Sequence, residues 1–136
     1  MIPTPYDRFI EDIKPFVDNK RIFTDPLRTF AYGTDASFYR FVPKVVVRAL
    51  NEKEVRDVIA VANSYGLPVT FRAAGTSLSG QASTDSILVL AGQGWEKYEV
   101  LEEGRAIRTQ TGIVGARLNQ ILKPYGVKIG PDPASV

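Results

Sequence analysis

The sequence predicts an α+β fold in which a small mixed sheet carries flanking helices. Three observations favour this class. A short apolar strand, an amphipathic helix and a second strand follow one another between residues 45 and 71. A loop of Gly, Ala, Ser and Thr follows the second strand directly, and two later β segments are joined by a tight turn at 102–105. Strand–helix–strand order is typical of parallel strands, whereas a tight turn predicts an antiparallel pair.

The N-terminal segment predicts a helix over residues 4–17. Thr4 is a favourable N-cap and Pro5 occupies the first helical position, where proline is well tolerated. Apolar residues then recur at helical spacing, and Pro15 is expected to kink or end the helix. The aromatic stretch that follows, residues 23–41, shows no strong regular pattern.

The central segment predicts a parallel βαβ unit. The β-branched run Val45–Val47 is typical of a buried strand. Asn51 caps the next helix with Glu54 three positions later, and Gly66 ends it. Residues 68–71 then form the second strand, reached by a right-handed crossover.

The remaining elements follow from shorter signals. Residues 87–90 predict a third apolar strand, and residues 98–101 and 106–111 predict a hairpin-like pair. Apolar residues between 118 and 125 mark a third helix. Residues 127–129 are expected to form a last short strand.

The most informative segment is the loop at 72–81, Arg-Ala-Ala-Gly-Thr-Ser-Leu-Ser-Gly-Gln. Its position at the carboxyl end of a strand is where α/β sheets usually bind ligands, and its backbone N–H groups and hydroxyls could surround an anion such as a phosphate. The same residue types also build plain turns, so composition alone leaves both interpretations open. The loop is neither a Walker phosphate loop, which needs a following Gly-Lys-Ser/Thr, nor a Rossmann fingerprint.

Composition excludes several classes of function. The 136-residue chain has no Cys and no His, which removes disulfides, thiolate nucleophiles, Cys-ligated metals and His-based hydrolytic triads. A net charge of +2 with interleaved signs argues against a nucleic-acid partner. No signal peptide and no membrane-spanning run stand out, and the scattered carboxylates suggest no metal site. We therefore expect a cytoplasmic protein without a transmembrane segment.

The loop and its surroundings resemble a known family. Residues 72–81 are similar to the pyrophosphate-binding loop of FAD-linked oxidases with a PCMH-type FAD-binding domain, in particular the D-lactate dehydrogenase and glycolate oxidase flavoprotein branch. The entry segment 32–37 with Tyr39, the strand at 43–49, the helix around Leu118-Asn119-Gln120, and Pro131-Asp132-Pro133-Ala134-Ser135 resemble the same branch in the same order.

The resemblance implies the first subdomain of a PCMH-type FAD-binding domain, with FAD as cofactor. By motif position, the phosphate site would be lined by Arg72, Ala73, Ala74, Gly75, Thr76, Ser77, Gly80 and Gln81. The isoalloxazine side would be approached by Pro131, Asp132, Ala134 and Ser135. Thr76 stands where some branches carry a flavin-linking His, so the FAD would be non-covalent. Arg72 could pair with a phosphate or instead with a carboxylate.

The resemblance also implies an activity for a larger enzyme, the oxidation of a small 2-hydroxy acid such as D-lactate or glycolate. Residues 1–24 would be an N-terminal helical extension and 25–136 the FAD-binding subdomain, with the chain expected to be an inactive fragment. The second FAD subdomain and the substrate domain would lie outside it, and no catalytic or metal-binding residue is assigned within it. The electron acceptor is left open. The alternatives are a stand-alone anion- or nucleotide-binding module and an interaction module without catalysis.

Overall fold

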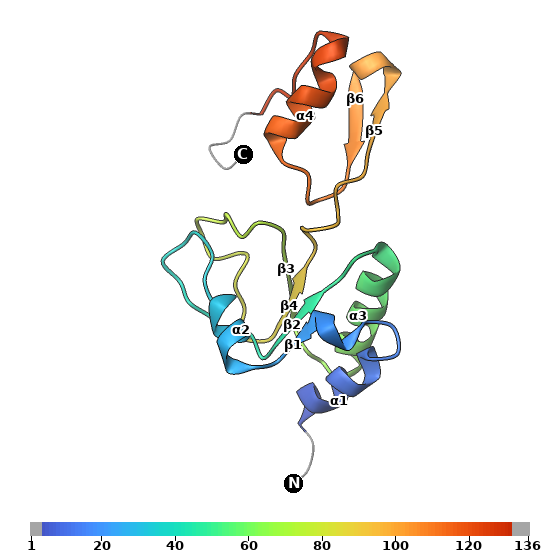
Figure 1. The fold of residues 1–136 in the computed structure, drawn as a ribbon. Coiled ribbons are helices and arrows are strands. Elements are labelled where there is room, and N and C mark those ends of the chain that lie inside the picture. The colour runs from blue at the N-terminus through green and yellow to red at the C-terminus, as the bar shows by residue number, and fades with distance from the viewer. Residues whose placement is uncertain (1–3, 132–136) are drawn as a thin grey trace. The chain divides into compact units, whose positions relative to one another are not determined.

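The computed structural model describes residues 4–131 and confirms the α+β class, with small sheets and flanking helices (Figure 1). The chain divides into two compact units, Met1–Ala91 and Gly92–Val136. In the first unit the elements are α1 (Pro5–Ile13), η1 (Asn19–Arg21), β1 (Ile22–Phe23), α2 (Pro26–Ala31), β2 (Val45–Arg48), α3 (Glu52–Ser64), β3 (Val69–Arg72) and β4 (Ile87–Leu90). In the second they are β5 (Tyr98–Leu101), η2 (Glu102–Gly104), β6 (Ala106–Thr109), α4 (Gly115–Leu122) and η3 (Lys123–Tyr125). The boundary expected after residue 24 stays a prediction.

The sheet of the first unit has the order β1-β2-β4-β3. Strands β2 and β3 both run parallel to β4, which lies between them, while β1 is antiparallel to β2. Arg48 of β2 and Arg72 of β3 occupy the same register, on either side of Leu90. Because these strands end together, the loop that follows β3 begins at the carboxyl edge of the sheet, where ligands of α/β sheets bind.

The core of the first unit lies on both faces of β2 and β4. Leu88 and Val46 are fully buried, and they cluster with Phe23 and Leu90 against the partly buried Tyr32. Alternation along the strands places Val45, Val47, Ile87 and Val89 on the opposite face. Helices α1 and α3 lie on one side of the sheet and α2 on the other (Figure 1). The strands beneath the predicted loop are therefore held from both sides.

Helix α3 begins at the residue that the sequence indicates. The side chain of Asn51 accepts a hydrogen bond of 2.9 Å from the N–H of Glu54, and this bond satisfies one of the free donors of the first turn. The matching prediction for α1 is also confirmed, since Thr4 and Asp7 form a reciprocal capping box. Helix α1 ends at Ile13, two residues before Pro15.

Removal of the α3 cap gives a first testable prediction. Asn51→Ala should lower the free energy of unfolding by about 1 kcal/mol, because the N–H of Glu54 loses its acceptor. Urea unfolding followed by circular dichroism measures this change. Asn63→Ala, an exposed position near the end of the same helix, is the matched control and should change stability by less than about 0.5 kcal/mol. Equal stabilities for the two variants would contradict the cap assignment.

Two expectations about local structure need correction. The aromatic stretch 23–41, in which no regular pattern was expected, contains α2 and the last residue of β1. Residues 127–129 form no strand; instead the N–H of Ile129 donates 3.0 Å to Oδ1 of Asn119 on α4. In the described residues the one ladder of this unit is the antiparallel pair β5–β6, which confirms the predicted hairpin.

Candidate functional site

The loop after β3 is irregular, and two glycines determine its path. Gly75 and Gly80 have φ angles of +77° and +78°, which residues with side chains rarely adopt. A Cβ atom at Gly75 would also overlap the guanidinium group of Arg72. The loop therefore needs glycine at position 75 both for its backbone angles and for the close approach of a charged side chain.

The N-terminal half of this loop presents unpaired backbone donors. Within the described part of the chain, the N–H groups of the six consecutive residues Ala73 to Leu78 donate no hydrogen bond. All six residues are partly or fully exposed. A run of free N–H groups around a positive-φ glycine is the arrangement by which protein loops bind anions.

The second half of the loop is held by Ser77. The hydroxyl of Ser77 accepts hydrogen bonds from the N–H groups of Ser79 (3.3 Å) and Gln81 (3.1 Å), and it donates to the carboxamide oxygen of Gln81. Ser77 and Gln81, both predicted to line the phosphate site, therefore bond to each other within the loop. The hydroxyl of Thr76 has no hydrogen bond with any described residue and remains available as a donor.

Arg72 points toward a segment far away in the sequence. Its Nη1 donates to the carbonyl oxygens of Thr34 (2.7 Å) and Tyr32 (3.2 Å), and its guanidinium carbon lies 5.7 Å from the centroid of the Tyr32 ring. Among the described residues no carboxylate pairs with Arg72, so the carboxylate alternative left open by the sequence finds no support. The half-buried guanidinium keeps its positive charge at the base of the loop, which favours an anionic ligand.

The remaining predicted positions lie elsewhere. Pro131 is exposed at the end of the described chain, in the second unit. The predicted residues Asp132, Ala134 and Ser135 lie outside the described residues. Within residues 4–131 no group of acidic side chains could hold a metal ion, and no helix is long and apolar enough to cross a membrane.

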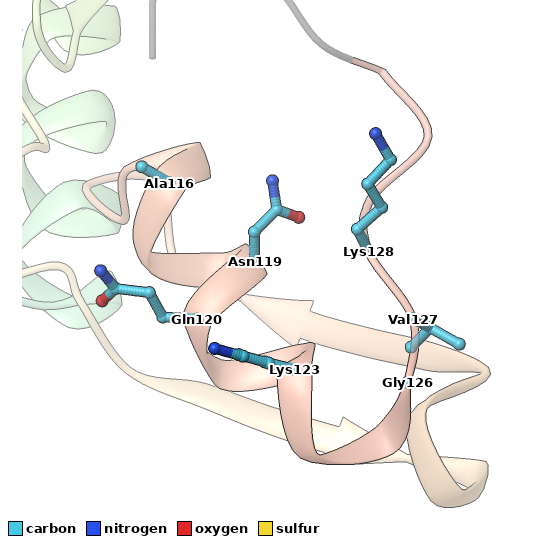
Figure 2. Close-up of a pocket in the computed structure, with 7 residues that line it drawn as sticks. All are labelled: Ala116, Asn119, Gln120, Lys123, Gly126, Val127 and Lys128. Atoms are coloured by element: carbon cyan, nitrogen blue, oxygen red, sulfur yellow. The ribbon is translucent and has the colours of Figure 1, made fainter.

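The structure also contains a surface hollow that the sequence did not predict. It lies in the second unit, has a volume of about 500 Å³, and is lined by α4 and the segment after it (Figure 2). Its polar lining consists of Lys123, Lys128 and the carboxamides of Asn119 and Gln120. Oδ1 of Asn119 accepts from the N–H of Ile129, which orients this side chain. These residues are scattered at helical and loop spacings that match no ligand motif.

Residues 43–136, more than half of the chain, match the FAD binding domain family. The chain belongs to this FAD-binding family. The fold predicted from the resemblance, the N-terminal part of a PCMH-type FAD-binding domain, is confirmed by solved structures. An alkyldihydroxyacetonephosphate synthase superposes with a TM-score of 0.78 at 20% identity, over 98% of this chain and 27% of that one. The 4-ethylphenol oxidase of Gulosibacter chungangensis superposes with a TM-score of 0.73 at 18% identity, over 96% of this chain and 26% of that one.

Curated relatives are enzymes of greater length. The D-2-hydroxyglutarate dehydrogenase of Pseudomonas putida is 31% identical over 93% of this chain and 13% of its own length. The glycolate oxidase subunit GlcD of Escherichia coli is 32% identical over 73% of this chain and 20% of its own length. The D-lactate dehydrogenase of Archaeoglobus fulgidus is 30% identical over 67% of this chain and 21% of its own length. The chain thus spans between an eighth and about a fifth of these relatives.

Proposed function

We propose that this chain is the pyrophosphate-binding part of an FAD-dependent oxidoreductase that oxidises a small 2-hydroxy acid, such as D-lactate or glycolate. The observation that carries the proposal is the run of unpaired N–H donors from Ala73 to Leu78, beside the unneutralised guanidinium of Arg72. Hydrogen bonds to a charged acceptor contribute roughly 1.5–3 kcal/mol each, so a few of these donors would hold a diphosphate firmly. The family match supports FAD as the molecule that contains this diphosphate.

Each loop residue then has a defined part. The N–H groups of Ala73 and Ala74 and the donors around Gly75 would face the two phosphates. The free hydroxyl of Thr76 adds a donor, while Ser77 and Gln81 keep the loop folded. Gly80 lets the chain turn back toward β4 at its positive φ. With no His or Cys in the chain, we propose that FAD is held non-covalently.

The substrate class rests on the relatives. Their names include D-2-hydroxyglutarate, glycolate and D-lactate, which are all 2-hydroxy acids. Bound FAD supplies the acceptor for the hydride removed from such a substrate. We propose that a second FAD subdomain, the substrate-binding groups and contacts to an electron acceptor belong to a longer cytoplasmic protein of which this chain forms one part.

Backbone amide NMR of the chain tests the proposed site directly. Titration with ADP and with FAD should shift the amide signals of residues 73–78 saturably, whereas adenosine, which lacks phosphates, should leave them in place. The amides of β5 and β6 provide an internal control. Absence of any shift at 73–78 with both phosphate ligands would overturn the proposed site. Equal shifts with adenosine would show that the loop binds the nucleoside and not the diphosphate, and would contradict the proposed phosphate site.

The substrate class needs a separate test. In the full-length protein, anaerobic addition of D-lactate, glycolate or D-2-hydroxyglutarate should bleach the visible absorbance of the bound flavin. Bleaching by none of the 2-hydroxy acids, with flavin bound, would contradict the substrate class but not the FAD site.

A further inference from the structure

A second loop, residues 32–41, lies against the loop at 72–81. We call residues 32–41 the clasp and residues 72–81 the phosphate loop. It is a small hairpin in which Thr34 and Arg40 form an antiparallel bridge and the N–H of Phe41 donates 3.0 Å to the carbonyl oxygen of Gly33. At its tip, the Oδ1 atom of Asp35 accepts the N–H of Ser37 at 2.8 Å. The clasp thus has internal hydrogen bonds that give it a defined shape.

The clasp contacts the phosphate loop at its start, middle and end. At the start, the carbonyl oxygen of Thr34 accepts a hydrogen bond from Arg72. In the middle, the N–H of Ala36 donates 3.1 Å to the carbonyl oxygen of Gly75. At the end, Oδ2 of Asp35 accepts the N–H of Ala82 at 3.3 Å. Near that end the Tyr39 ring packs so closely against Gly80 that a Cβ atom there would lie 2.8 Å from it.

These contacts determine where the free donors of the loop point. The carbonyl oxygen of Gly75 is turned toward the clasp by the N–H of Ala36. Because a trans peptide holds its C=O and N–H in opposite directions, the N–H of Thr76 must point away from the clasp. The clasp therefore occupies the acceptor side of this peptide and leaves its donor side open to a ligand.

The side chain of Asp35 joins the tip of the clasp to the far end of the phosphate loop. One carboxylate oxygen accepts the N–H of Ser37 at the tip of the clasp, and the other accepts the N–H of Ala82, the residue that follows the phosphate loop. The side chain of Ser37 makes the largest contribution that holds the pKa of Asp35 below its ordinary value, and the backbone N–H groups of Ser37 and Ala82 act in the same direction. The group is therefore a charged acceptor with both oxygens engaged.

We infer that Asp35 is a positioning residue for diphosphate binding, and that the clasp sets the direction of the loop's N–H donors before any ligand arrives. This inference rests on the proposed function. Donors that are already oriented bind an anion without the entropic cost of ordering a loop, so affinity depends on the clasp. Asp35 itself acts through the loop and need not contact the ligand.

The test compares ADP binding by wild-type chain, Asp35→Asn and Asp25→Asn, using the amide signals of residues 73–78. Asn has one acceptor oxygen, so Asp35→Asn can keep the bond to Ser37 or to Ala82 but not both. We expect ADP affinity to fall about tenfold, as for the loss of one hydrogen bond to a charged group. Asp25→Asn removes the same charge at the cap of α2, where Asn also caps well, and should keep wild-type affinity.

The outcomes separate this inference from the proposed function. If wild-type amides do not respond to ADP, the proposed site itself fails. If they respond and Asp35→Asn binds as tightly as Asp25→Asn, the positioning role is wrong. A weaker affinity at unchanged melting temperature supports it, because a purely structural role would act through stability. Should Asp35→Asn not fold, Asp35→Ser, whose hydroxyl can still close the tip but is too short for Ala82, gives the same comparison.

Discussion

Gly75→Val should reduce the affinity of the chain for ADP by about 100-fold or more, equivalent to about 2.7 kcal/mol. The new Cβ atom would overlap the guanidinium of Arg72, which is held by the carbonyl oxygens of Tyr32 and Thr34. Arg72 would have to leave those bonds, and a β-branched residue at φ +77° would force the loop into another path. Both changes remove the orientation of the free N–H donors. Amide NMR or calorimetric titration with ADP measures the loss.

Gly66→Val is the matched control for this substitution. Gly66 has a similar φ of +64°, but a Cβ atom there meets nothing within 4 Å. The control therefore carries the backbone strain of valine without the collision with Arg72, at the end of α3 and away from the loop. Both variants should lose stability, and only Gly75→Val should lose the ligand. Wild-type ADP affinity in Gly75→Val would remove the loop from the proposed site.

The elements that the sequence predicted correctly are those with complete local signals. Strand β2 has a β-branched run, and α3 has both its cap at Asn51 and its stop at Gly66. Helix α2 was missed although Asp25 caps it and Pro26 occupies its first turn. Its six residues are too few to show a periodic apolar face, and a cap without such a face does not by itself predict a helix.

The site was predicted less completely than the fold. The position of the loop after β3 follows from the strand signal, and the need for Gly75 follows from its motif. The partners of Arg72 could not be predicted, because they are backbone carbonyl oxygens of residues about forty positions earlier. Carbonyl groups are present at every residue, so only the folded clasp shows which of them face the guanidinium. The same is true of Asp35, whose partner at Ala82 is a backbone N–H.

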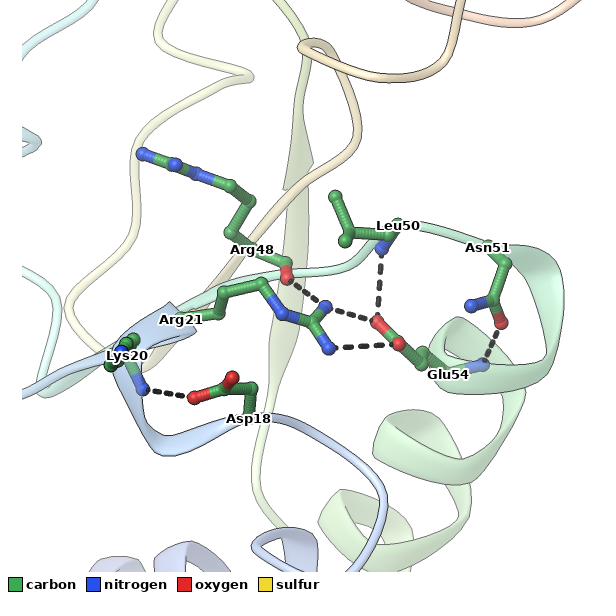
Figure 3. Close-up of polar contacts among 7 residues, drawn as sticks. All are labelled: Asp18, Lys20, Arg21, Arg48, Leu50, Asn51 and Glu54. Carbon is green, nitrogen blue, oxygen red and sulfur yellow. Dashed lines mark hydrogen bonds and ion pairs between the residues drawn. The ribbon is translucent and has the colours of Figure 1, made fainter.

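A half-buried ion pair joins β1 and the residue before it to α3 (Figure 3). The guanidinium of Arg21 donates to both carboxylate oxygens of Glu54, at 2.5 and 2.9 Å, and also to the carbonyl oxygen of Arg48. The N–H of Leu50 donates 3.0 Å to the same carboxylate. The side chains are only 18% and 12% exposed, so little water can replace a lost partner.

Glu54→Gln should therefore lower the free energy of unfolding by about 2–3 kcal/mol, because Arg21 keeps its half-buried charge without its hydrogen-bonded carboxylate partner. Glu52→Gln removes an equal charge from the same helical turn at an exposed position, and it should cost less than about 0.5 kcal/mol. Urea unfolding followed by circular dichroism measures both. Equal losses for the two variants would show that negative charge in the first turn of α3, and not the ion pair with Arg21, stabilises the protein.

The pH dependence of this difference identifies the ion pair as its source. Burial by itself would raise the pKa of Glu54, but the hydrogen bonds from Arg21 and Leu50 outweigh burial and hold that pKa below its ordinary value. A carboxyl group with a lowered pKa in the folded state stabilises the protein fully above its unfolded pKa of about 4.3, and this contribution is lost as the pH falls through the folded value. The gap between wild type and Glu54→Gln should thus be constant near neutral pH and shrink on acidification below about pH 4.3. A gap that stays constant through that range would show that the charge of Glu54 is not its source, because Glu and Gln have nearly the same volume and only Glu titrates.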